Sequence, residues 1–312
     1  MKRMKQIISI FLFVWSFYVN GKELSFFYED YNDIYDQFTS DYYIDSCEHG
    51  DGIKCVAIAY LYIKGEGVIK NPKKGIDYLE KACHLDYGVG CGILGEIYRI
   101  GYNVDKDLKK SIYYFKKGCS LKNGISCSML GFVNENTYND SKTAFRYYKK
   151  SCDLGLGLAC ANLGTLYRDG KGTQKNINNS LDSFNTSCQL GVGLACTYLG
   201  SFYESSSNNT NDNNYQLAMN YYEEACYLSD GLGCIYLGDL YLNENSLDAN
   251  LIEAKKYYDK ACLLNESKGC YNYALLLGKE EKENSQKNKI RYLKKACKLG
   301  DKLSCFEIGP DF

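Results

Sequence analysis

The side chains with the strongest intrinsic chemistry in this sequence are its 16 cysteines, which could form disulfides, bind a metal or act as nucleophiles. The cysteines occur in pairs whose members stand eight positions apart. Eight positions along one continuous helix would separate their Cα atoms by ~12 Å, whereas a disulfide needs a separation of roughly 4.4 to 6.8 Å. Cysteines that far apart can therefore bond only if the chain reverses between them, which the glycines common in these stretches allow. All 16 fall into pairs with this spacing: Cys47 and Cys55, Cys83 and Cys91, Cys119 and Cys127, Cys152 and Cys160, Cys188 and Cys196, Cys226 and Cys234, Cys262 and Cys270, Cys297 and Cys305.

Two other uses of the cysteines stay open at this point. A bond could join the second cysteine of one pair to the first of the next, as in Cys91–Cys119. That separation varies from 25 to 30 positions, whereas the short one never changes, so the spacing favours the local bonds. Zinc ligands usually come as cysteines two to four residues apart, and the two histidines, His49 and His84, fit exposed loop positions. We predict structural disulfides, with no metal site, no cofactor and no catalytic cysteine.

The cysteine pairs also mark a sequence repeat. Their first members lie 36, 36, 33, 36, 38, 36 and 35 residues apart. Counted from the second cysteine of a pair, leucine recurs at position 3, glycine at position 4 and tyrosine at position 7. Together with the cysteine these positions line one face of an α-helix, which we call helix A. Examples are Leu94, Gly95 and Tyr98, or Leu199, Gly200 and Tyr203.

A second helix, helix B, is predicted to precede each pair and to end near its first cysteine. Aromatic or apolar residues stand five and four positions before that cysteine, as in Tyr114-Phe115, and a small residue such as Gly118 stands directly before it. Glycine inside helix A costs ~1 kcal/mol relative to alanine, so we expect helix B to approach Gly95 and its equivalents closely. The pattern predicts an all-α fold, an α/α superhelix or solenoid of helical hairpins.

The ends of the chain predict export and caps. Basic residues before an apolar run from Ile7 to Val19 are typical of a secretory signal peptide, assigned to residues 1–21. Removing Lys2, Arg3 and Lys5 would change the net charge from −1 to −4, which argues against a nucleic-acid partner. No later segment is apolar enough to span a membrane. We assign residues 22–54 to an N-terminal capping helix, 55–297 to seven repeats and 298–312 to a C-terminal stub, and expect a secreted or periplasmic monomer.

The repeat resembles the Sel1-like repeat, and the regular cysteine pairs resemble the Helicobacter cysteine-rich protein family. The resemblance covers nearly all of the chain after the signal, from Asp41 to Cys305. It implies an α/α superhelix with one disulfide per repeat. It also implies binding of proteins or peptides, or a weak penicillin-binding or β-lactamase activity that hydrolyses β-lactam amide bonds. An asparagine-rich loop at residues 208–214 and Asn134, where tyrosine is expected, depart from the pattern.

The sequence does not show how β-lactam hydrolysis would work. A serine β-lactamase needs Ser-x-x-Lys, Lys-Thr-Gly and Ser-Asp-Asn elements, and no serine here is followed by lysine at the third position. The stretch Lys171-Gly172-Thr173 only permutes the second element, and Tyr138-Asn139-Asp140 lies in a short connection. The catalytic residues of such an activity, if it exists, stay unknown.

The binding hypothesis rests on residues that vary between repeats. Stacked hairpins generally present an extended concave surface, and positions 2 and 5 of helix A point away from its core face. We predict that the chain binds a protein, a peptide or a cell-wall fragment there, with β-lactams as the alternative. The residues selected are Glu96, Asn162, Tyr198, Tyr236, Asp239 and Asn272.

Overall fold

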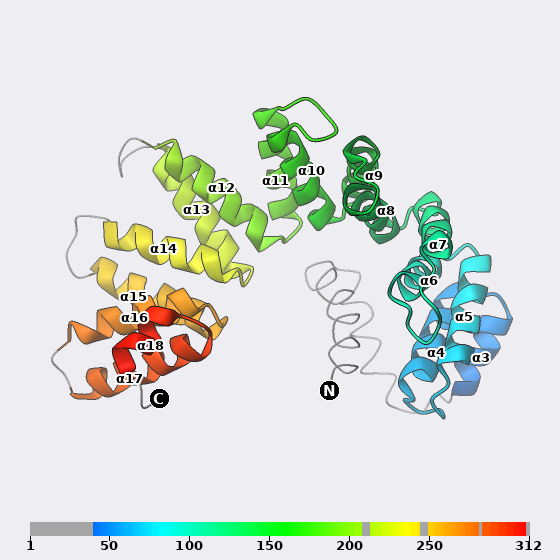
Figure 1. Ribbon diagram of the computed structural model, residues 1–312, viewed down its shortest axis with the longest axis horizontal. Coiled ribbons are helices and arrows are strands. Elements are labelled where there is room, and N and C mark those ends of the chain that lie inside the picture. Colours follow the sequence, from blue (N-terminus) through cyan, green and yellow to red (C-terminus); the bar gives the residue numbers. More distant parts are fainter. Residues whose placement is uncertain (1–39, 208–212, 244–248, 281–282, 310–312) are drawn as a thin grey trace. The chain divides into compact units, whose positions relative to one another are not determined.

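The computed structural model describes residues 40–207, 213–243, 249–280 and 283–309, and these residues form helices joined by short connections (Figure 1). The predicted signal peptide, residues 22–39 of the predicted cap and residues 310–312 of the stub lie outside the described residues. So does most of the asparagine-rich loop. The helices are α3 (Ser40–Glu48), α4 (Gly52–Lys64), α5 (Pro72–His84), α6 (Gly88–Ile100), α7 (Leu108–Ser120), α8 (Gly124–Asn136), α9 (Ser141–Asp153), α10 (Gly157–Asp169), α11 (Ile177–Gln189), α12 (Gly193–Ser205), α13 (Asn213–Tyr227), α14 (Gly231–Asn243), α15 (Ala249–Leu263), α16 (Ser267–Gly278), α17 (Glu283–Lys298) and α18 (Lys302–Ile308).

Consecutive helices pair as hairpins, which confirms the all-α prediction. The even-numbered helices α4 to α16 are A helices, and the odd-numbered helices α5 to α17 are their B partners. At the ends, α3 is a B helix that precedes the first hairpin, and α18 is an A helix that follows the last. Contacts divide the chain into two compact units, Met1–Ser183 and Phe184–Phe312, each of which is described separately. Within the units, consecutive A helices also contact each other: α4 with α6, α6 with α8, α12 with α14, and α14 with α16.

Local sequence signals set where the helices begin and end. The carboxylate of Asp51 accepts hydrogen bonds from the first turn of α4, and Asn71 and Asp107 do the same for α5 and α7. Such N-caps satisfy backbone N–H groups that have no partner inside the helix. Helices α4 and α6 end where Gly65 and Gly101 take φ values of 81° and 75°, in the left-handed region that favours glycine. These two glycines therefore begin the turns that connect helix A to helix B.

The glycine at position 4 of helix A is the point of closest approach to helix B, as predicted. A Cβ atom added to Gly95 would lie 2.5 Å from a ring carbon of Phe115, and one added to Gly131 would lie 2.7 Å from the ring of Tyr148. Both aromatic rings are almost fully buried. The same contact recurs in the second unit between Gly200 and Tyr222.

Tyrosines from the two helices of a hairpin stack face to face next to this glycine contact. Tyr62 and Tyr78 lie 5.8 Å apart between ring centroids with an interplanar angle of 8°. Equivalent pairs follow in three further hairpins: Tyr98 with Tyr114, Tyr203 with Tyr221, and Tyr241 with Tyr257. Where Asn134 replaces the helix A tyrosine, its side-chain amide donates to the carbonyl of Leu130 at 2.7 Å. The departure noted in the sequence thus changes one stacked pair and leaves the hairpin intact.

Candidate functional site

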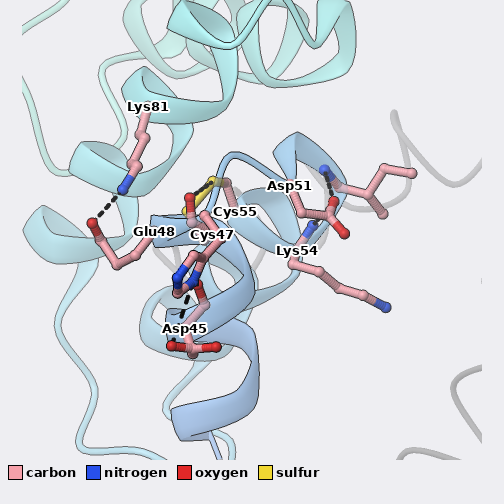
Figure 2. Close-up of a disulfide and its surroundings, with 9 residues drawn as sticks. Asp45, Cys47, Glu48, Asp51, Lys54, Cys55 and Lys81 are labelled. Atoms are coloured by element: carbon pink, nitrogen blue, oxygen red, sulfur yellow. Dashed lines mark hydrogen bonds and ion pairs between the residues drawn. A yellow bond between two sulfur atoms is a disulfide. The ribbon is translucent and has the colours of Figure 1, made fainter.

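Each cysteine pair is bonded locally and joins the end of a B helix to the start of the next A helix. The eight bonds have Cα–Cα distances of 4.4 to 4.9 Å. Figure 2 shows the first joint, where Cys47 at the end of α3 is bonded to Cys55 in the first turn of α4. No cysteine is free, and the described residues hold no cluster of three metal-ligating side chains. The structure therefore has the short bonds and neither the longer Cys91–Cys119 type nor a zinc site built on cysteines.

The third residue after the first cysteine turns the chain at every joint. All eight of these residues have a positive φ. Four are glycines, as the sequence led us to expect, and four carry side chains in this left-handed conformation. The eight residues are Gly50, Asp86, Lys122, Gly155, Gly191, Ser229, Asn265 and Gly300. Glycine content alone therefore underestimated how uniform the joints are.

Small residues let the two helices of a joint approach each other beside the disulfide. A Cβ atom added to Gly233 would lie 2.4 Å from the Cβ of Ala225, and one added to Gly269 would lie 2.5 Å from the Cβ of Ala261. At the joint of Cys119 and Cys127 the glycine, Gly118, is on the B helix instead of the A helix. A Cβ atom added to it would lie 2.3 Å from the hydroxyl oxygen of Ser126. The residue before each cysteine of the pair must be small at these joints.

Three of the six predicted ligand residues lie apart from one another. Asn162 is exposed on α10, and Tyr198 on α12 packs its ring against Phe184 with centroids 4.0 Å apart. Glu96 differs from the prediction, because it is only 8% exposed and its carboxylate binds the Arg99 guanidinium through two hydrogen bonds of 2.6 and 2.7 Å. This bond raises the pKa of Arg99, and burial partly offsets the rise. The helical periodicity did not predict that this side chain is buried and bonded within its own helix.

The other three predicted residues meet in one cluster in the second unit. The carboxylate of Asp239 accepts a hydrogen bond from the side-chain amide of Asn272 at 3.4 Å and lies 3.7 Å from the ammonium of Lys268. That ammonium also lies 5.9 Å from the ring centroid of Tyr236. Because Asp239 is on α14 and Asn272 is on α16, adjacent repeats build the cluster together. Its residues are half-buried or exposed, so it faces solvent with aromatic, amide and charged groups.

Buried tyrosines hold the carboxylates of this face in place. Tyr258 donates its hydroxyl to Asp239 at 2.5 Å, and Tyr222 donates to Glu204 at 2.7 Å. Burial, followed by these hydrogen bonds, raises the pKa of both phenols well above the ordinary value. Tyr236 packs against Tyr222 with ring centroids 5.3 Å apart. The hydroxyls thus orient acidic groups toward the surface without being able to ionise at neutral pH.

The stretches considered for catalysis have structural roles. Asn139 turns the chain with a φ of 53°, and Asp140 caps α9 by accepting a hydrogen bond from the backbone N–H of Thr143. Hydrogen bonds from Thr143 lower the pKa of Asp140. Gly172 packs directly on the backbone of Ser141. No observation in the described residues favours β-lactam hydrolysis, which stays an expectation from the resemblance.

A groove between the B helices α11 and α13 was not singled out by the sequence reasoning. Its cavity volume is about 290 Å³. Sequence periodicity predicts faces of single helices, whereas this groove forms between helices of consecutive repeats. It is lined by Asn185, Cys188, Gln189, Leu217, Asn220, Tyr221 and Glu224.

Comparison with protein families identifies the repeat. The Sel1 repeat model matches seven consecutive segments, residues 55–87, 90–123, 128–156, 157–191, 193–230, 231–266 and 267–301, well over half of the chain. The chain belongs to the Sel1 repeat family. Sel1 repeat proteins are built from stacked helical hairpins, and the hairpins described above account for every matched segment.

Solved structures share the fold of this Sel1 repeat protein. A Sel1 repeat protein from Oxalobacter formigenes superposes with a TM-score of 0.68 at 19% identity, covering 86% of this chain and 78% of that one. A protective antigen of uropathogenic Escherichia coli strains with an SLR fold gives a TM-score of 0.65 at 20% identity; the match covers 86% of this chain but only 58% of the antigen.

A third solved structure and the curated proteins add nothing to this assignment. Cysteine rich protein B of Helicobacter pylori is 28% identical over 51% of this chain and 90% of that one, with a TM-score of 0.22 that supports no inference. No curated protein matches the chain.

Proposed function

We propose that this Sel1 repeat protein is a scaffold that works outside the cytoplasm, secreted or periplasmic, and binds a protein or peptide on its helix A surface. Its eight disulfides are typical of oxidising compartments and rare in the cytoplasm. Within the described residues, no helix is both long and apolar enough to cross a membrane.

The observation that carries the proposal is the cluster of Tyr236, Asp239 and Asn272. These residues occupy positions that vary from repeat to repeat, on a frame of cysteines, leucines and glycines that recurs. Asn272 and Lys268 bridge from one repeat to the preceding one through Asp239, so the cluster spans two hairpins. Tyrosine and amide groups of this kind suit recognition of a polypeptide, because they combine apolar area with hydrogen bonding.

The proposal is tested by capture of partners from an extract of the cell envelope. We expect the disulfide-intact chain to retain partners that the variant Tyr236→Ala/Asn272→Ala does not. The control variant Tyr113→Ser/Tyr138→Ser removes two tyrosines that are 60% and 54% exposed and lie outside the helix A surface. It should capture the same partners as the original chain. If both variants unfold at the same temperature as the original chain and capture the same partners, the assignment of the site to helix A is refuted.

A further inference from the structure

The groove between α11 and α13 belongs to a type of contact that recurs between consecutive B helices. The tyrosine five positions before the first cysteine donates its hydroxyl to the side chain three positions before the preceding first cysteine. Tyr221 donates to Asn185 at 3.2 Å in this groove. The same bond joins Tyr114 to Glu80 at 3.2 Å and Tyr292 to Asp259 at 2.5 Å. These three pairs of B helices therefore share one contact, and equivalent positions in them can be compared residue by residue.

Five other B helices carry a lysine at this contact, whereas α3 has Asp45 and α11 has Thr186 at the equivalent position. The residue two positions before the first cysteine is lysine on α5, α7, α9, α15 and α17: Lys81, Lys117, Lys150, Lys260 and Lys295. Three of these lysines reach back to the preceding joint. Lys295 donates to the carbonyl of Cys262 at 2.7 Å, Lys117 lies 3.5 Å from Asp86, and Lys81 binds Glu48, as Figure 2 shows. An ammonium is thus the group that these contacts accommodate.

On α13 the equivalent residue is Glu224, which has the opposite charge. It lines the groove together with Cys188, the counterpart of the Cys262 that accepts from Lys295. The carbonyl of Cys188 accepts from the backbone N–H of Gly191 at 2.9 Å, and within the described residues no lysine reaches it. The last carbonyls of a helix attract cations, so this groove keeps the acceptors of the contact and lacks the internal ammonium.

The surrounding sequence is also acidic. No lysine or arginine occurs between Lys175 and Lys255, whereas this stretch contains ten aspartates and glutamates. Among the described residues, neither Glu224 nor its neighbour Glu223 forms an ion pair. Leu217 and Tyr221 add apolar surface to the same groove, with Leu217 38% exposed. The groove therefore combines an apolar wall with uncompensated negative charge.

We propose that this groove binds a lysine or arginine side chain of a partner polypeptide, in the place where other repeats hold their own lysine. The stem of the side chain would pack on Leu217 and Tyr221, as long basic side chains pack on apolar surface while the charged end stays near polar groups. The cation would bind Glu224 and the carbonyl end of α11. A cavity of about 290 Å³ is smaller than most of the roughly 300–1,000 Å³ sites for small ligands, and it suits one side chain of a longer partner. This site goes beyond the proposed helix A surface, because B helices form it.

The test uses a fluorescein-labelled nonapeptide of alternating lysine and serine, with norleucine and glutamate versions as comparators. Fluorescence polarisation at moderate salt should show binding of the lysine peptide to the disulfide-intact chain and at least tenfold weaker binding of both comparators. The variant Glu224→Lys should lose at least tenfold in affinity, because it restores the internal lysine. Lysine stands at this position on five other B helices, so the variant is expected to fold, which its thermal unfolding checks.

The matched control is Glu223→Lys, which makes the same change of charge on the adjacent residue outside the groove lining. We expect its affinity to stay within threefold of the original chain. Equal losses in the two variants would show only long-range attraction and would overturn the site, as would equal binding of the norleucine peptide. Self-association of the original chain that Glu224→Lys abolishes would assign the groove to a second copy and overturn the peptide proposal.

Nuclear magnetic resonance locates the bound peptide. The side-chain amide signals of Asn185, Gln189 and Asn220 should shift on addition of the lysine peptide, and those of Asn162 and Asn272 should not. Shifts confined to Asn272 would place the peptide on helix A and refute the groove. Glu224→Lys should leave envelope capture through the helix A surface unchanged, so the two proposals can fail separately.

Discussion

Four side chains at the disulfide joints occupy a backbone conformation that usually belongs to glycine. Asp86, Lys122, Ser229 and Asn265 have φ values between 58° and 67°, and the glycines at the other joints also have a positive φ. A left-handed conformation costs an ordinary residue roughly 1–2 kcal/mol. Asparagine and aspartate tolerate it best, because their short polar side chains bond locally. The joints at Lys122 and Ser229 are therefore the strained ones.

Replacement by glycine should relieve that strain. We expect Ser229→Gly and Lys122→Gly each to raise the free energy of unfolding by about 0.5–1 kcal/mol, because the relief exceeds the extra entropy that glycine loses on folding. The change is measured by urea unfolding with the disulfides intact. The control is Gly155→Ala, at φ 86°, which should lower the same free energy. A lower free energy of unfolding in both Ser229→Gly and Lys122→Gly would contradict this prediction.

The crowded glycines of helix A lead to a prediction with the opposite sign. Gly131→Ala should lower the free energy of unfolding by about 1–3 kcal/mol, the usual cost of overpacking, because the new Cβ meets the buried ring of Tyr148 at 2.7 Å. Gly278→Ala is the matched control on another A helix. A Cβ atom added to Gly278 would lie 3.2 Å from the flexible side chain of Lys289, which can move away. Because alanine favours the helix more than glycine does, the free energy of unfolding should stay the same or rise. Thermal unfolding of the two variants should therefore shift in different directions.

The buried tyrosines should make the fold sensitive to alkali. Burial and hydrogen bonds to carboxylates raise the pKa of Tyr148, Tyr222 and Tyr258 above the ordinary value of 10.0. Their contribution to stability is complete below that value and is lost as the pH rises above it, since the unfolded chain ionises first. We expect the free energy of unfolding to fall above pH 10, and to fall less steeply in Tyr258→Phe. An equal slope in the variant would show that other groups cause the loss.

At the scale of the elements, the sequence predicted more of the fold than of the surface. Positions 0, 3, 4 and 7 of helix A face the core in every repeat, and a constant spacing of cysteines can be read directly as a constant joint. Glu96 was not predicted correctly, because a position that periodicity places away from the core is only 8% exposed and is bonded to Arg99. The groove at Glu224 was not predicted either. It is recognised only by comparison with Lys81, Lys117 and Lys295, which reach the preceding joint from the equivalent position of other B helices.

At the scale of the whole molecule, the disulfides decide whether the chain folds. Each closes a loop of nine residues, and there are eight. At ~2.5 kcal/mol for each loop in the chain-entropy model, they contribute roughly 20 kcal/mol together. Native proteins have a net stability of only about 5–15 kcal/mol, so the reduced chain should not stay folded. This supports the proposal that the chain works in an oxidising compartment.

Reduction provides the corresponding test. We expect full reduction followed by thiol blocking to abolish cooperative unfolding and most of the helical circular dichroism signal at 25 °C. Loss of one bond, in Cys226→Ala/Cys234→Ala, should leave a folded chain that is about 2–3 kcal/mol less stable. The double replacement keeps both helix ends apolar, so its effect reports the bond rather than an unpaired thiol. A blocked, fully reduced chain that keeps its helicity and its melting transition would show that the hairpins stack without their bridges, and would remove the energetic argument for folding outside the cytoplasm.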